Sequence, residues 1–190
     1  MPFNITQFRA QMVADGARPS LFQVEITFPQ YVSGTVAGGN EKIKFMVKAT
    51  GMPESSLPAV EQKYMGRGVN FAGDSRQWGD WNITVICDED FIIRTAFERW
   101  IDGIDVASTT SSGKRIGATS DPYSYVASAR IVQFAKDGRE AKVYNLVNAF
   151  PINVGSIQLS WDAANQIEEF PVTMKFDYAT TDDLGMQDLA

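Results

Sequence analysis

The stretch FPVTMKFDY, residues 170–178, places an apolar or aromatic side chain at every second position. Successive side chains of a β-strand point to opposite faces, so this period of two predicts a strand with one buried face. Pro171 cannot donate a backbone hydrogen bond, which predicts that the strand lies at a sheet edge or contains a bulge. The C-terminal part of the chain is therefore expected to form β-sheet.

The same period of two recurs toward the N-terminus. Residues 21–28 and residues 42–48 show it, and so does the run from Trp81 to Cys87. Turn residues separate further runs into expected hairpins, which is typical of antiparallel sheets. These hairpins pair residues 60–65 with 69–71, 125–135 with 142–149 across Asp137-Gly138, and 156–161 with 170–178. The sequence thus predicts a mainly β protein of antiparallel strands.

A short N-terminal helix is expected before the first strand. Asn4 and Gln7 have the spacing of a capping box, and Ile5, Phe8 and Met12 follow at helical intervals until residues 15–16.

One longer helix is expected over about residues 88–102. Asp88 is a suitable N-cap, and Ile93, Phe97 and Trp100 form an apolar stripe that ends at Gly103. This pattern predicts one main α-helix in the chain.

The remaining segments lack apolar periodicity. Two prolines in residues 51–58 indicate an extended connection that exposes Met52 and Leu57. Three further irregular segments are a glycine-rich turn at 33–40, a flexible loop at about 106–122 and a frayed acidic tail at about 179–190.

Composition indicates one soluble domain over residues 1–190. The chain is 44% hydrophobic, which suffices for a core, and its single cysteine excludes an internal disulfide. No secretory signal or membrane-spanning run is visible, so synthesis in a cytoplasm is expected. The net charge of -6, with basic residues scattered, disfavours tight nucleic-acid binding because phosphate contacts need a clustered basic face.

The chain lacks the residues that most catalytic sites need. It has no histidine, which removes the commonest general base and most metal sites. Cys87 follows the apolar phase of its strand and is expected to be a core thiol, with a reactive nucleophile as the alternative. Trp81 and Trp100 also fit core positions better than a stacking platform. We therefore expect a non-enzyme without catalytic residues, cofactors or metal ions.

Three stretches resemble the tail tube protein family of contractile-tailed bacteriophages, which is related to the tube proteins of type VI secretion. The first is ARPSLFQVEI at residues 17–26. The second includes KATGMP at 48–53, VNFAGD at 69–74, WNITV at 81–85 and RW at 99–100. The third is NVGSIQLSWD at 153–162, followed by Asn165, Ile167 and FDY at 176–178. Residues 106–122 and those beyond 178 depart from the family pattern.

The resemblance implies a structural virion protein whose fold is a β-sandwich or half-barrel with one flanking α-helix. Six copies would form each ring, and rings would stack into an inner tube enclosed by a sheath protein, with baseplate and tail-terminator proteins at its ends. DNA would pass through the channel without specific binding, and the tail would be assembled in the host cytoplasm. Two alternatives keep the fold, a baseplate or terminator component and a secreted ring protein, whereas a hydrolase or a carbohydrate-binding sandwich is the alternative from another class.

Two exposed apolar segments are candidates for the contact between rings. They are the N-terminal helix and residues 51–58, unless both fold back on their own core. The candidate ring-stacking residues are Phe8, Met12, Met52, Pro53, Leu57 and Pro58.

Overall fold

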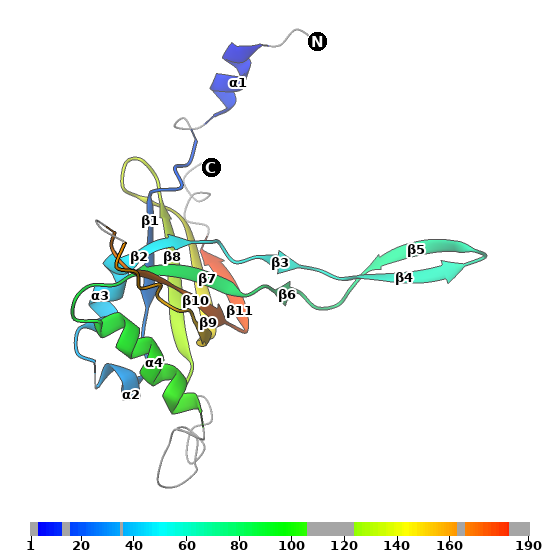
Figure 1. The fold of residues 1–190 in the computed structure, drawn as a ribbon. Coiled ribbons are helices and arrows are strands. Elements are labelled where there is room, and N and C mark those ends of the chain that lie inside the picture. The colour runs from blue at the N-terminus through cyan, green and yellow to red at the C-terminus, as the bar shows by residue number, and fades with distance from the viewer. Residues whose placement is uncertain (1–3, 13–15, 35, 106–123, 163–165, 183–190) are drawn as a thin grey trace.

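The computed structural model describes residues 4–12, 16–34, 36–105, 124–162 and 166–182, and its body consists of two antiparallel sheets that share strand β9 (Figure 1). The first sheet has the order β1-β8-β9-β11, and the second has the order β2-β7-β10-β9. The strands of the body are β1 (Phe22–Ile26), β2 (Val47–Thr50), β7 (Trp81–Ile86), β8 (Ala127–Phe134), β9 (Glu140–Val154), β10 (Glu169–Lys175) and β11 (Tyr178–Asp182).

Strand β9 bends where it passes from one sheet to the other. Its first part pairs with β8 and β11, and its last residues pair with β10. At the bend, Asn148 has a positive φ of 57°, and its side-chain amide donates a 2.7 Å hydrogen bond to Asp177 Oδ2. Asparagine tolerates this backbone conformation better than most residues do. The result is a curved sheet that does not close into a barrel, which agrees with the half-barrel that the resemblance implies.

Helices cover one face of the curved sheet (Figure 1). They are α2 (Gln30–Ser33), α3 (Gly39–Met46) and α4 (Ile92–Ile104), while α1 (Ile5–Gln11) stands clear of the body. Phe97 and Trp100 of α4 are fully buried, and Phe28 meets both rings edge-on at centroid distances of 5.3 and 5.6 Å. Burying each such aromatic side chain stabilises the fold by roughly 1.5–3 kcal/mol.

The remaining strands form a projecting arm. Its base is the pair β3 (Ser55–Ser56) and β6 (Gln77–Trp78), and its outer part is the hairpin of β4 (Ala59–Tyr64) and β5 (Arg67–Ala72). Figure 1 shows the arm extending far from the body.

Several expected elements are confirmed. The run from Trp81 to Cys87 forms β7 with its alternate residues buried, and the hairpin around Asp137-Gly138 forms β8 and β9. The N-terminal helix is present, and Asn4 Oδ1 accepts hydrogen bonds from the backbone of Thr6 and Gln7, as a cap should.

Residues 42–48 were wrongly expected to form a strand. Helix α3 covers most of them, and only Val47 onward is extended. Helix α3 buries Ile43, while Phe45 points to solvent with 79% of its surface exposed. The glycine-rich turn expected at 33–40 is also replaced in part, because α2 ends and α3 begins within it.

Residues 156–161 were likewise wrongly expected to pair with 170–178. They form no strand, since β9 and β7 already occupy both edges of β10. Strand β10 is therefore not an edge strand, although a register shift does occur between Thr173 and Met174, two residues beyond Pro171.

The main helix begins later than the expected 88–102. It starts at Ile92 after Phe91, whose φ is 50°, and Asp90 in place of Asp88 accepts a hydrogen bond of 3.0 Å from the Ile92 amide. Gly103 lies inside this helix and does not end it. Residues 179–182 of the expected tail at 179–190 belong to β11, and residues 183–190 lie outside the described residues. The expected loop at 106–122 lies outside the described residues.

Candidate assembly surfaces

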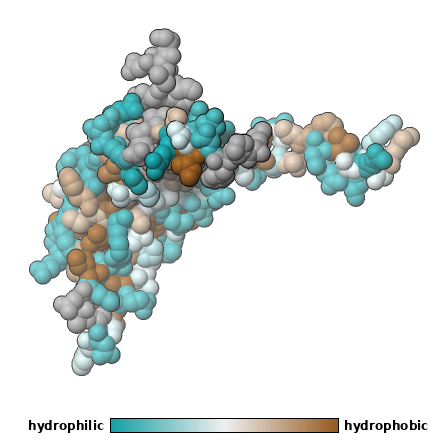
Figure 2. Space-filling view, turned by 90° about the horizontal axis from the view of Figure 1, so that it is seen from above, coloured by the Kyte–Doolittle hydropathy of each residue, from teal (hydrophilic) through white to brown (hydrophobic). Residues whose placement is uncertain are grey.

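The β4–β5 hairpin has one apolar face that nothing in the described chain covers. Residues directly opposite each other on antiparallel strands share a face, and Val60 is opposite Phe71, Gln62 opposite Val69 and Tyr64 opposite Arg67. The apolar members of this face are 46–70% exposed, and no residue of either strand is buried. Figure 2 shows apolar surface on the arm among hydrophilic residues.

The hairpin tip is cationic as well as apolar. A two-residue turn of Met65 and Gly66, both with positive φ, joins the strands, and Met65 is 88% exposed. Arg67 directly follows this turn and Lys63 lies two residues before it, and neither has an ion pair among the described residues. The tip therefore has the two properties that a docking element for an acidic, partly apolar surface needs.

Residues 51–58 lead from the body to the hairpin, and we call them the limb of the arm. The candidate ring-stacking residues Met52, Pro53, Leu57 and Pro58 lie on this limb. Met52 and Leu57 are 51% and 56% exposed, as expected, and Pro53 is half-buried. The limb is not a free connection, because β3 pairs with β6 and the Gly79 amide donates a 3.0 Å hydrogen bond to Glu54 O. These four residues thus lie on the same arm as the hairpin.

The candidate residues Phe8 and Met12 lie apart from that surface. Both are on or directly after α1, which points away from the body in a different direction from the arm (Figure 1). Phe8 is 64% exposed and Met12 is 41% exposed, and α1 has no buried residue. The structure therefore separates the six candidate residues into two surfaces.

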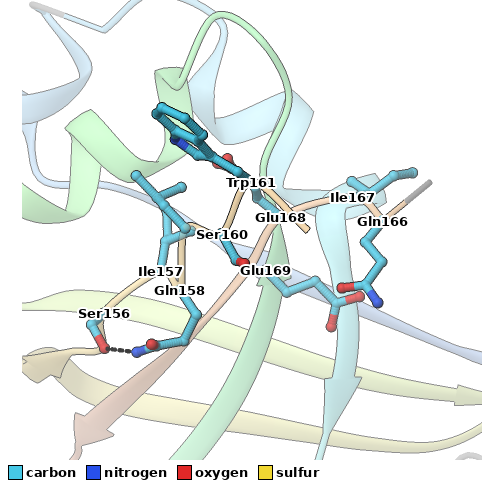
Figure 3. Close-up of a pocket in the computed structure, with 10 residues that line it drawn as sticks. Ser156, Ile157, Gln158, Ser160, Trp161, Gln166, Ile167, Glu168 and Glu169 are labelled. Atoms are coloured by element: carbon cyan, nitrogen blue, oxygen red, sulfur yellow. Dashed lines mark hydrogen bonds between the residues drawn. The ribbon is translucent and has the colours of Figure 1, made fainter. Parts of the chain in front are cut away.

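A third surface was missed because residues 156–161 were predicted as a strand. Together with residues 166–169 they line a pocket of about 620 Å³, which we call the loop pocket (Figure 3). Leu159, Trp161 and Ile167 at this pocket are highly exposed, and Trp161 is completely so. The signal in the sequence is Trp161 itself, a large aromatic residue that no predicted core phase required.

The loop pocket is acidic. Among the described residues, its lining includes Glu168 and Glu169 and no lysine or arginine. Lys48 Nζ pairs with Glu169 at 2.5 Å, whereas Glu168 has no ion pair among the described residues. The pocket therefore presents one uncompensated carboxylate beside exposed apolar side chains.

Open strand edges supply further surface for contacts between chains. Within the described residues, β1 and β11 are the outer strands of one sheet, and β2 is an outer strand of the other. Unpaired backbone groups at such edges can accept a strand from another chain.

Nothing in the described part of the chain suggests catalysis. Cys87 is buried, and desolvation raises the pKa of its thiol, as expected of an inert core residue. No cluster of three potential metal ligands occurs among the described residues, and none of the helices in that part of the chain could span a membrane.

Comparison with known proteins identifies the family. The model of the phage tail tube protein family matches residues 17–181. The chain belongs to this family. As a tail tube protein it is a structural component of the virion tail, and its family is not one of enzymes.

Two curated tail tube proteins are similar in sequence. Tail tube protein gp19 of Enterobacteria phage T4 is 34% identical over 171 residues, which is 90% of this chain and 94% of the relative. Tail tube protein gp19 of Enterobacteria phage T6 has the same identity and coverage.

Solved structures of contractile injection systems share the fold. A chain from the anti-feeding prophage baseplate has a TM-score of 0.61 at 12% identity, over 90% of this chain and 98% of that one. A chain from the sheath-tube complex of the PVC extracellular contractile injection system has a TM-score of 0.58 at 13% identity, over 96% of this chain and 100% of that one.

Proposed function

We propose that this tail tube protein forms hexameric rings that stack into an inner tube, through which phage DNA passes into the host cell. The observation that carries the proposal is the exposed apolar surface of the arm on a chain of the tail tube family. A monomer gains nothing from leaving such surface in water, whereas an assembly buries it. Six-fold symmetry is supported by the shared fold with the baseplate structure, which is six-fold symmetrised.

Ring closure uses the open strand edges in this proposal. A head-to-tail contact that closes by rotation gives a ring, and the outer strands β1, β2 and β11 can each extend a sheet into a neighbouring copy. A sheath protein would surround the tube, and baseplate and terminator proteins would contact its ends. Assembly in the host cytoplasm is part of the same proposal.

The channel is proposed to let DNA pass without holding it. The net charge of -6 motivates this, because a strongly basic lumen would bind phosphates at every ring. A map of the tube in which rings of lysine and arginine line the channel would contradict this part of the proposal.

The stacking role of the arm limb can be tested with the double variant Met52→Asp and Leu57→Asp. We expect a folded protein that no longer forms long tubes, because two charges replace apolar side chains that would be buried between rings. Negative-stain electron microscopy and sedimentation measure the tubes, and circular dichroism checks the fold. Ser55→Asp and Ser56→Asp in one chain add the same two charges at exposed polar positions of the same limb and form the matched control. Normal tubes from the apolar-to-acid variant would contradict this role.

A baseplate or terminator component is the second candidate. Chains from the anti-feeding prophage tube-terminating cap and the PVC sheath/tube terminator share the fold, with TM-scores of 0.61 and 0.59. The purified protein separates the two candidates, since a tube subunit gives long polymers and a terminator gives single rings.

A further inference from the structure

The β4–β5 hairpin needs a partner that its own chain does not supply. An isolated two-stranded hairpin is marginally stable in water, because one ladder of hydrogen bonds and one exposed apolar face do not offset its ordering entropy. All twelve residues of β4 and β5 are exposed. Since the hairpin projects away from the body, the surface that completes it lies on another molecule (Figure 1).

The loop pocket has the chemistry that the hairpin tip lacks. It offers Leu159, Trp161 and Ile167 as apolar contacts and Glu168 as a carboxylate without an ion pair among the described residues. The tip offers Tyr64 and Met65 as apolar groups, and Arg67 shares the face of Tyr64. A guanidinium can form two parallel hydrogen bonds with a carboxylate, which fixes the orientation of the contact.

The charges also argue for a second copy of this chain as the occupant. Copies with a net charge of -6 repel one another, so a contact between them is favoured where a locally basic element meets an acidic one. The tip and the loop pocket are different surfaces of one molecule. A contact between them is therefore head-to-tail and can repeat from copy to copy.

We propose that the hairpin tip docks into the loop pocket of a second copy of this chain, with Arg67 pairing with Glu168. This inference rests on the proposed function, because it assigns a partner surface to the arm of the tube subunit. It adds a specific pair of residues that must be complementary in charge.

Charge reversal tests the pairing. Arg67→Glu and Glu168→Lys should each raise the critical concentration for tube formation by at least about tenfold, because each places like charges in contact. The double variant should have a critical concentration for tube formation close to that of the wild type. Light scattering measures the critical concentration, and circular dichroism establishes that each variant is folded.

Two matched controls accompany these variants. Lys63→Glu makes the same charge change on the other face of the hairpin, and Glu89→Lys makes the acid-to-base change outside the pocket. Both control variants should have a critical concentration for tube formation close to that of the wild type. Failure of the double variant to recover, or equal loss in the controls, would overturn the pairing.

A crosslinking measurement is independent of charge and folding effects. Met65→Cys and Leu159→Cys are combined in one chain, where buried Cys87 stays silent, and assembled tubes are treated with a short bis-maleimide. We expect a ladder of covalent multimers, which either single variant lacks. Tubes that give no ladder would overturn the inference while leaving the tube function intact, whereas a wild-type chain that never assembles would contradict the tube function itself.

Discussion

At the scale of single residues, the sequence pattern predicts burial best for the alternate residues of a strand that face the core. Trp81, Ile83 and Val85 are predicted and found in the core because a period of two leaves no other arrangement for them. Phe91 could not be predicted, since its positive φ depends on the turn that leads the chain into α4. Gly103 lies inside α4, although a glycine near the end of an apolar stripe usually ends a helix.

Replacing Gly103 by alanine should destabilise the protein, although alanine has the higher helix propensity. A Cβ at this position would overlap the ring of Tyr31, whose hydroxyl donates a 3.0 Å hydrogen bond to Trp100 O. We expect Gly103→Ala to lower the free energy of unfolding by about 1–3 kcal/mol, as overpacking does. Urea denaturation followed by fluorescence measures this change.

The control for Gly103→Ala is a Tyr31→Ala background. With the ring removed, the same substitution should raise the free energy of unfolding by up to about 1 kcal/mol, the ordinary difference between alanine and glycine in a helix. Destabilisation of equal size in both backgrounds would exclude the Tyr31 contact as the cause.

At the scale of elements, the strands were largely predictable and the connections between them were not. Residues 42–48 fit a strand or a helix equally by apolar spacing, and packing of Ile43 against the core decides for the helix. The loop pocket was not predicted because residues 156–161 have strand-like composition. Their expected partner, β10, is occupied on both edges by strands far away in sequence.

The start of α4 should be sensitive to acid. The pKa of Asp90 is lowered to about 2 from its ordinary value of 3.8. The largest cause is a hydrogen bond with Asp88, and the next largest is a hydrogen bond with Lys42 of α3. A depressed pKa in the folded state means that the carboxylate stabilises the fold above about pH 4, and that this contribution is lost as the pH falls toward 2. The carboxyl resonance of Asp90 should therefore titrate near pH 2.

An Asp90→Asn variant checks the sign of this effect. It should be less stable than the wild type at pH 6, and the difference should shrink as the pH falls from 4 to 2, because the wild-type carboxylate is then neutralised. Thermal denaturation across this range measures the difference. A difference that widens on acidification would show that Asp90 is not stabilised in its charged form.

At the scale of the whole molecule, the body and the arm are separable. The Gly73 amide donates a 2.8 Å hydrogen bond to Pro58 O, so the two ends of the hairpin lie together at its base. Replacing residues 59–72 by Asn-Gly should leave the melting temperature of the body nearly unchanged, because no residue of β4 or β5 is buried. The same change should abolish tube formation. Calorimetry and electron microscopy measure the two outcomes, and a large loss of body stability would show that the arm supports the fold.

The bent strand β9 has a mechanical consequence. Because one unbroken backbone of 15 residues belongs to both sheets, force applied to one sheet reaches the other through covalent bonds and not only through side-chain packing. The sheets therefore cannot slide past each other without breaking the hydrogen-bonded ladders that β9 makes with its three neighbours. A column built from such units would be stiff within each unit and would bend at the joints between them.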